Sequence, residues 1–469
     1  MAEDLTSRRA LVLGAGMAGS TTAAALTPFF DRVTLVERDH ITGSATDRRP
    51  GLPQAAHAHL LLGSGARWID TLLPGTTAAL VAAGAHRLSM PAQVHTLSPH
   101  GWLPPIPEAQ FLLSATRSLI DSVVRERLRT DGKIELRAGT EVVGLIGDAT
   151  RVRGARLRDR TTGAVREEPA TLVVDATGAT SAVTAWLAEL GTTPVPTTVV
   201  DAGVGYATRA LRLPDAWRQF GAIYLQADPA GTGRGGVLLP VEDDRWLLSL
   251  SGVRGQNPPT DEPGFDAFTA GLRHPVLAEA LAQAIPLGPI RGFRKLANRW
   301  RHFERRGFGP DGLVVLGDAT RSFNPAYGHG MSVAAQSATV VRTVLTRDAS
   351  APDLAARLQR AVARCAADAW AFASGQDARY LTEAPPGPGL RLQRWYMDRL
   401  GRAAVHRTAV TRTLLKSYTL DAPAGRLLAP RVLGQVLTVT TGPPPPSPFP
   451  PEVLPQRLPP GSATERTAP

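Results

Sequence analysis

The chain has 469 residues, 43% of them hydrophobic, and is therefore long enough to bury a large core in two or three lobes. Its net charge of +11 comes mainly from arginine spread along the whole sequence, which argues against a nucleic-acid-binding protein and favours attraction of anionic substrates or carriers. The sequence has no apolar run long enough to span a membrane, no signal-peptide pattern and a single cysteine, Cys365, so we expect a cytoplasmic protein without an internal disulfide.

The N-terminal stretch of residues 11–38 has the order strand, glycine turn, helix, strand. Gly14, Gly16 and Gly19 form a G-x-G-x-x-G pattern, which allows a tight turn, backbone approach to a pyrophosphate, and close packing of the helix. Glu37 stands at the end of the second strand, where an acidic side chain can hydrogen-bond ribose hydroxyls. The order of these features favours a dinucleotide site over a purely structural turn.

Residues 39–60 follow this motif and can reach the ring end of a bound dinucleotide. They include His57 and His59, which share one face of an extended segment. No cysteine or third histidine lies close to His57 and His59 in the sequence, so we expect hydrogen bonding or packing from these histidines and no metal site.

A helix is predicted over residues 114–128, with Leu119, Val123 and Val124 at helical spacing. Arg117 lies in its first turn, where a cation opposes the helix dipole. An anionic partner such as a phosphate would explain this arginine, and a solvated surface arginine is the other interpretation.

Two stretches have the composition of a substrate pocket. Residues 86–110 are rich in proline around Trp102, which indicates either a pocket wall or an ordinary connection. Residues 200–252 have antiparallel-strand composition. There Trp246 and Leu248 share an apolar face that either lines a pocket or belongs to the sheet core.

A second nucleotide-type motif lies at residues 313–345. An apolar strand ends at Asp318, whose carboxylate can bind a sugar or ribityl hydroxyl. Pro325, Gly328 and Gly330 follow, and the glycines allow backbone N–H groups to reach a ring system at the start of the next helix. Because this motif is far from the first, the nucleotide-binding domain is expected to be discontinuous.

The sequence resembles flavoprotein monooxygenases of the para-hydroxybenzoate hydroxylase type in three motifs: GAGMAG with Glu37, VVDATG, and GDATRSFNPAYGHGM. Over roughly residues 8–380 it is most similar to the bacterial epoxidases of polyether antibiotic biosynthesis. The segments that carry this similarity are RRPGLPQAAHAHLL, LLPGTTAALVAAGAHR, FLLSATRSLID, DAGVGYATR and FNPAYGHGMSVAAQS.

The resemblance implies an FAD site and assigns residues to it. The ADP half of FAD would be held at Gly14, Gly16, Gly19, Glu37 and Arg38, and the diphosphate or ribityl chain at Arg117 and Asp318. Backbone groups of Pro325, Gly328, Gly330 and Met331 would approach the isoalloxazine ring, with Arg49 and Gln54 near it. We expect no catalytic side chain, because the flavin performs the chemistry, and a dry substrate pocket formed by Trp102, Tyr206, Trp246 and Phe323.

The expected fold is α/β, with a discontinuous Rossmann-like FAD-binding domain, an inserted antiparallel-sheet substrate domain and a C-terminal helical region. Residues 1–85, 110–185 and 295–348 are assigned to the FAD-binding domain, and residues 86–109 and 186–294 to the substrate domain. Residues 349–440 are expected to be helical, and the proline-rich tail of residues 441–469 to be disordered.

The resemblance also implies a function: an oxidoreductase that epoxidises olefins of a linear polyketide through a flavin C4a-hydroperoxide, with NAD(P)H as electron donor, directly or through a reductase. The substrate would be free or carrier-bound, and an epoxide hydrolase would act on the product. A flavin hydroxylase of an aromatic polyketide, and an FAD reductase or dehydrogenase, share these motifs and stay open as alternatives. The W-x-W-x-I-P signature of flavin halogenases is absent.

Overall fold

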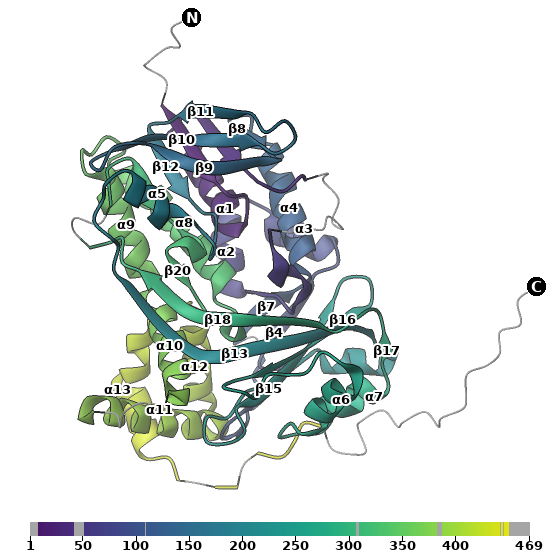
Figure 1. Ribbon diagram of the computed structural model, residues 1–469. Helices are drawn as coiled ribbons and strands as arrows, with labels where there is room; N and C mark the ends of the chain where they lie inside the picture. Colours follow the sequence, from purple (N-terminus) through teal and green to yellow (C-terminus); the bar gives the residue numbers. More distant parts are fainter. Residues whose placement is uncertain are drawn as a thin grey trace, which may run out of the picture.

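The computed structural model describes residues 8–41, 51–107, 109–305, 309–381, 387–440, 442–443 and 445–449. Two large sheets lie one above the other along the length of the molecule, and the last helices lie beside the second sheet (Figure 1). The cofactor motifs belong to the first of these sheets.

The first sheet has five strands, all parallel, in the order β19-β12-β1-β2-β8. Its strands are β1 (Arg9–Leu13), β2 (Arg32–Val36), β8 (Ile134–Arg137), β12 (Leu172–Asp175) and β19 (Leu313–Val315). The late motif thus supplies an edge strand to the sheet that the N-terminal motif begins, and this sheet is assembled from segments far apart in the chain. The expected α/β fold with a Rossmann-like domain is confirmed.

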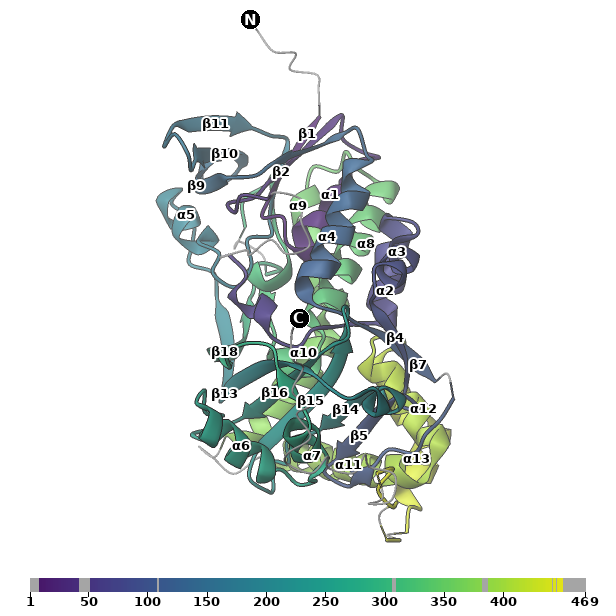
Figure 2. The same ribbon diagram turned by 90° about the vertical axis from the view of Figure 1, so that its right-hand side faces the viewer.

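Both faces of the parallel sheet are covered, which explains why its strands are apolar on both sides. Helices α1 (Met17–Leu26), α2 (Gly63–Leu72), α3 (Thr76–Ala82), α4 (Arg117–Arg129), α8 (Gly330–Arg347) and α9 (Leu354–Cys365) cover one face, where Val12, Leu35 and Val174 join the core. An antiparallel sheet of β9 (Thr140–Gly147), β10 (Val152–Asp159) and β11 (Val165–Pro169) covers the other, together with α5 (Val183–Glu189). Figure 2 shows the helices and this small sheet on opposite sides of β1 and β2.

The glycine turn has the geometry expected of it. Gly14 has a φ of +94°, in the region that favours glycine. A β-carbon on Gly19 would lie 1.7 Å from the carbonyl oxygen of Gly14, so only glycine lets α1 approach the turn this closely.

The second sheet is mixed, in the order β20-β18-β13-β16-β15-β14-β5-β6, with β17 paired to β13. Its strands are β5 (Val94–Ser98), β6 (Gly101–Trp102), β13 (Thr197–Arg212), β14 (Ala222–Leu225), β15 (Arg234–Val241), β16 (Arg245–Gly252), β17 (Ile285–Pro286), β18 (Arg291–Arg301) and β20 (Arg321–Ser322). Helices α6 (Glu262–Ala270) and α7 (Val276–Ala282) pack on one face of it. Because β18 runs to Arg301, we propose that the boundary expected at residue 295 lies after this strand.

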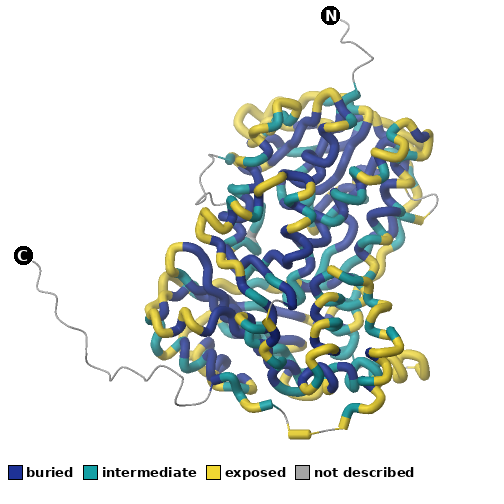
Figure 3. Tube along the Cα trace, turned by 180° about the vertical axis from the view of Figure 1, so that it is seen from behind, coloured by how far each residue is buried: buried dark blue, intermediate teal, exposed yellow. Residues whose placement is uncertain are grey.

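A third, three-stranded antiparallel sheet lies between the two larger ones and contains β3 (Leu60–Leu62), β4 (His86–Met90) and β7 (Gln110–Ser114). The last described helices are α10 (Ala367–Asp377), α11 (Pro388–His406), α12 (Thr408–Tyr418) and α13 (Pro430–Leu437). Figure 3 shows buried residues running through both large sheets, and many exposed residues on this last group of helices.

The expectation of a disordered tail from residue 441 is wrong at one point. Phe449 is 3% exposed and packs with Trp102 and Phe220 in the core of the second sheet. An aromatic ring can bury its apolar area even within proline-rich sequence, so Phe449 anchors the start of this segment. Residues 450–469 lie outside the described part of the chain, and within the described part no helix is long and apolar enough to cross a bilayer.

Candidate functional site

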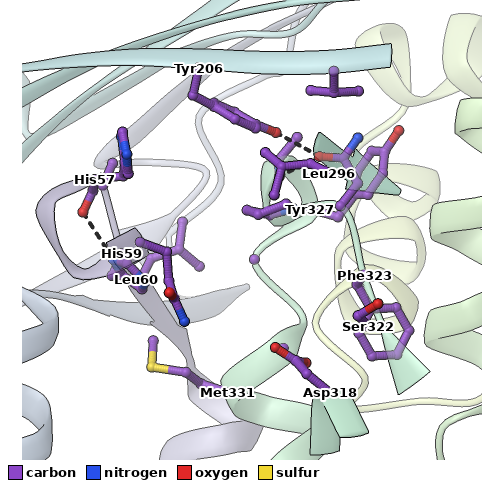
Figure 4. Close-up of a pocket in the computed structure, with 18 of the residues that line it drawn as sticks. His57, His59, Leu60, Tyr206, Leu296, Asp318, Ser322, Phe323, Tyr327 and Met331 are labelled. Atoms are coloured by element: carbon purple, nitrogen blue, oxygen red, sulfur yellow. Dashed lines mark hydrogen bonds between the residues drawn. The ribbon is translucent and has the colours of Figure 1, made fainter. Parts of the chain in front are cut away.

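A cavity of about 1020 Å³ lies between the carboxyl edge of the parallel sheet and the second large sheet. It extends from the glycine turn at Gly14 and Gly16, past Asp318, to the side chains of the C-terminal helices at Leu400 and Tyr418. Figure 4 shows its central part, where His57, His59 and Met331 face Tyr206, Tyr327 and Asp318 across the space. Both predicted cofactor motifs therefore open into one cavity.

Glu37 is fixed at the nucleotide end of this cavity. Its two carboxylate oxygens accept the backbone N–H groups of Ala15 and Asp39, each at 3.0 Å, and the side chain is 5% exposed. A carboxylate at the end of the second strand is the group that accepts hydrogen bonds from ribose hydroxyls in dinucleotide sites. Arg38 lines the same end of the cavity.

Arg117 begins α4 and points across the glycine turn. Its Nε donates to Asp121 Oδ1 at 2.8 Å, one helical turn on, and this carboxylate compensates the cation at the helix N-terminus. The anionic partner expected from the sequence therefore exists within the protein, while the guanidinium still lines the cavity near Gly16. A diphosphate contact from Arg117 stays a prediction.

Asp318 lies where β19 ends, in the cavity wall. Burial raises the pKa of its carboxyl to about 6, and the nearby positive charge of Arg117 acts in the opposite direction. A carboxyl with this pKa accepts or donates a hydrogen bond near neutral pH, which suits a polyhydroxylated ligand chain.

The loop before α8 brings backbone to the cavity surface. Pro325 begins a short 3-10 turn, and Gly328 ends it with a φ of +65°. A β-carbon on Gly328 would meet the Leu60 side chain at 2.7 Å, whereas at Gly330 no atom lies within 4 Å of that position. Met331 follows in the first turn of α8, so the N–H groups of this helix end lie beside open space.

A buried carboxylate holds this loop in place. Asp377, 1% exposed at the end of α10, accepts hydrogen bonds from the Tyr327 hydroxyl at 2.6 Å, the Asn298 amide at 2.6 Å and the Asn324 amide at 3.0 Å. Asn324 in turn accepts from the Tyr206 hydroxyl at 2.6 Å. The Asp377 carboxylate thus joins α10 and β18 to the loop, and β13 is joined to it through Asn324. No sequence motif points to Asp377.

The histidines of the connecting segment are neutral hydrogen-bonding groups. His57 Nδ1 lies 2.7 Å from the Thr208 hydroxyl, and His59 Nδ1 lies 2.9 Å from the His57 carbonyl oxygen. Burial lowers the pKa of each ring to about 4, with Arg291 acting on His57 and Arg117 on His59 in the same direction. Within the described residues, no group of three or more His, Cys, Asp or Glu side chains could hold a metal ion.

Two of the four residues predicted to form a substrate pocket do not reach the cavity. Tyr206 and Phe323 line the cavity, but Trp102 and Trp246 are buried in the core of the second sheet, against Phe449 and the sheet-covering helices. Strand β16 alternates as expected, yet its apolar face meets that core, and Ser249 and Ser251 on the opposite face line the cavity. The residues predicted to bind the cofactor line the cavity, Gln54 among them, with one exception: Gly19 lies under the turn. Arg49 lies outside the described residues.

Tyrosine is the residue that the sequence interpretation undervalued. Five of the six tyrosines in the chain line the cavity: Tyr206, Tyr224, Tyr327, Tyr380 and Tyr418. Burial raises the pKa of Tyr224 to about 12, and it also raises the pKa of the other four above the usual value. All five phenols therefore stay protonated, as neutral hydrogen-bond donors on an aromatic wall. These residues lie on five separate segments, so no local pattern could have grouped them.

The residues present fit an FAD molecule. Gly16 has no atom nearer than 3.9 Å to the place of a β-carbon and Gly330 has none within 4 Å, so backbone is bare toward the cavity at both motifs. The cavity wall also offers an arginine and a carboxyl group, and many of its other lining side chains are apolar. A long molecule with a diphosphate, a polyol and a ring system matches this sequence of groups.

The model of the FAD binding domain family matches residues 107–375. This chain belongs to that family. It is 32% identical over 410 residues to "Protein Rv3254" of Mycobacterium tuberculosis, a match covering 82% of this chain and 83% of the relative.

Two solved structures share the fold of this FAD-binding family member. A triple mutant of the flavin-dependent brominase Bmp2 superposes with a TM-score of 0.63 at 16% identity, covering 91% of this chain and 98% of that one. The p-nitrophenol 4-monooxygenase PnpA of Pseudomonas putida gives 0.62 at 15% identity, covering 89% and 99%. Family membership supports FAD as the cofactor, and these structures establish the flavin-dependent monooxygenase fold, which supports several different reactions.

Proposed function

We propose that this protein is an FAD-dependent monooxygenase that epoxidises olefins of a linear polyketide, as in polyether biosynthesis. The observation that carries the proposal is the continuity of the cavity. One space joins the bare glycine backbone of both cofactor motifs to an apolar compartment that includes Met90, Leu103, Leu239, Met397 and Leu414. An extended apolar substrate fits such a compartment better than a small polar one.

Bound FAD would supply the electrons that activate O₂ for transfer of one oxygen atom to the alkene. The other oxygen atom leaves as water, with two electrons from NAD(P)H, directly or through a reductase. This reaction needs no nucleophilic side chain, and the sequence predicts none.

The chain's own contribution would be binding, orientation and exclusion of water. Gly14, Gly16, Glu37 and Arg38 would hold the ADP half, and Arg117 and Asp318 the diphosphate and ribityl chain. Backbone N–H groups from Gly328 to Met331, at the start of α8, would stabilise negative charge on the ring. The Asp377 hydrogen bonds would keep that backbone in one conformation, and burial of the site keeps water from the reacting atoms.

A hydroxylase of an aromatic polyketide is the second candidate. The five tyrosines of the cavity favour it, since aromatic walls stack well on aromatic rings. A conjugated or linear olefin also packs against such rings.

The decisive experiment begins with an absorbance spectrum of the purified protein, followed by NADPH, with a flavin reductase added, under ¹⁸O₂. A linear polyene and an activated phenol are offered in parallel. We expect bound-flavin bands and a polyene product that gains one ¹⁸O atom. A protein that takes up no FAD overturns the proposal, and labelling of the phenol alone replaces the epoxidase with the hydroxylase.

A further inference from the structure

The C-terminal helices carry an unusual surface. Six of the twelve large hydrophobic side chains that are exposed within the described residues lie between positions 390 and 437: Leu390, Leu392, Trp395, Leu428, Leu433 and Leu437. This segment is about a tenth of the chain, so exposed apolar groups are strongly concentrated in it. Leu392 is 64% exposed and Trp395 is 47% exposed. Single exposed hydrophobic side chains are common on protein surfaces, whereas clusters of them are uncommon.

Contacts join the segments that carry Trp395, Leu428 and Leu437. The Arg399 guanidinium lies 5.6 Å from the centre of the Trp395 ring and donates to the Leu437 carbonyl oxygen at 2.8 Å, which joins α11 to the end of α13. The Tyr396 hydroxyl donates to the Leu427 carbonyl oxygen, beside Leu428. Figure 2 shows α11, α12 and α13 together at one end of the molecule, next to the second sheet. We call the exposed side of these helices the α11–α13 face.

The same segment holds most of the net charge. Residues 388–437 contain nine arginines or lysines and two aspartates, whereas residues 1–387 contain 41 basic and 37 acidic residues. The arginine excess is therefore concentrated here rather than spread evenly as the sequence had first indicated. Both aspartates already have cationic partners, Asp398 with Arg402 at 2.6 Å and Asp421 with Arg67. The electrostatic field of this face is accordingly positive.

We propose that the α11–α13 face docks on the surface of a membrane that contains anionic lipids. Leucine and tryptophan side chains enter the headgroup region one by one, without the shape match that a protein partner requires, and the surrounding arginines meet lipid phosphates. Helix α11 also separates this face from the cavity, because Met397, Leu400 and Ala404 line the cavity from it. An apolar substrate dissolved in the bilayer would then lie one helix away from its binding site.

The docking inference depends only on this face, so it can fail while the proposed oxygenase reaction holds, and the reverse. The test is co-sedimentation of the full-length FAD-bound protein with vesicles of phosphatidylcholine alone, or of equal parts phosphatidylcholine and phosphatidylglycerol. We expect binding to the anionic vesicles only, weakened by salt. The double variant Leu392→Asn, Trp395→Asn should bind them roughly tenfold more weakly.

Two further variants make the outcome specific. Ile285→Asn removes an equally exposed side chain, 62% exposed on β17, and should bind vesicles like the wild type. Arg391→Glu with Arg431→Glu changes two exposed arginines outside the cavity and should lose vesicle binding while retaining FAD. Absence of wild-type binding to anionic vesicles, equal binding to neutral ones, or an equal loss in Ile285→Asn overturns the proposal. If the wild type does not bind vesicles but forms a concentration-dependent dimer, and the double variant Leu392→Asn, Trp395→Asn is monomeric, the face binds a second copy of the chain instead.

Discussion

The carboxylate of Asp377 offers the most direct test of how the site is built. Asp377→Asn preserves the size of the side chain but leaves one acceptor oxygen and places an N–H₂ group against the donors of Tyr327, Asn324 and Asn298. A hydrogen bond to a charged group contributes about 1.5–3 kcal/mol. The remaining oxygen can still accept from two of the three donors, because Asn324 Nδ2 lies 3.0 and 3.1 Å from the two carboxylate oxygens. Loss of the third hydrogen bond, partly offset by removal of a buried charge, should lower the free energy of unfolding by about 2 kcal/mol.

The effect should extend to the cofactor, because the loop held by Asp377 includes Pro325 and Gly328. Urea unfolding measures the stability, and titration of the apoprotein with FAD, followed by flavin fluorescence, measures the dissociation constant. Asp368→Asn on the same helix is the matched control, since Asp368 accepts only the Ala424 N–H, at 3.0 Å, among its described contacts. If Asp377→Asn costs less than about 1 kcal/mol and binds FAD like the control, the carboxylate does not organise the loop.

Two further predictions follow from the glycine turn and from a buried histidine. Gly19→Ala should prevent folding, because its β-carbon would overlap the Gly14 carbonyl oxygen. Gly16→Ala should instead have an unfolding free energy within about 1 kcal/mol of the wild type and bind FAD more weakly. Far-UV circular dichroism measures the folding of each variant, and FAD titration measures its affinity for the cofactor. His329 is neutral in the fold, since burial lowers its pKa to about 4 from 6.5, so the unfolded chain takes up its proton first as pH falls. The contribution of neutral His329 to the free energy of unfolding is present above pH 6.5 and is lost as the pH falls toward 4, by up to about 1.4 kcal/mol per pH unit. His329→Gln should therefore reduce the slope of unfolding free energy against pH in this range. His406→Gln, at an exposed position, should not change that slope. A His329→Gln slope equal to the wild-type slope would contradict this assignment.

The sequence was sufficient wherever a structural requirement is local. The apolar run before Gly14 and the acid at Glu37 define a strand, a turn and the next strand, and the structure has β1 and β2 within two residues of those limits. The Arg117 partner was also within reach, because Asp121 lies four residues on, at the spacing of a helical ion pair. Asp377 was out of reach, since it acts on a loop fifty residues away and no pattern marks a buried acceptor.

Strand β16 shows the physical limit of a periodic pattern. Alternation assigns side chains to two faces, but it does not reveal which face meets a core and which meets a cavity. The apolar face, with Trp246 and Leu248, packs against α6 and α7, while Ser251 on the other face lines the cavity. Trp246→Ala should therefore cost about 3–5 kcal/mol of stability by leaving a hole in the core. Ser251→Leu should instead leave the unfolding free energy nearly unchanged and alter the turnover of long substrates relative to short ones, as measured by product formation at saturating FAD. Equal stability losses in the two variants would show that Ser251 is part of the core as well.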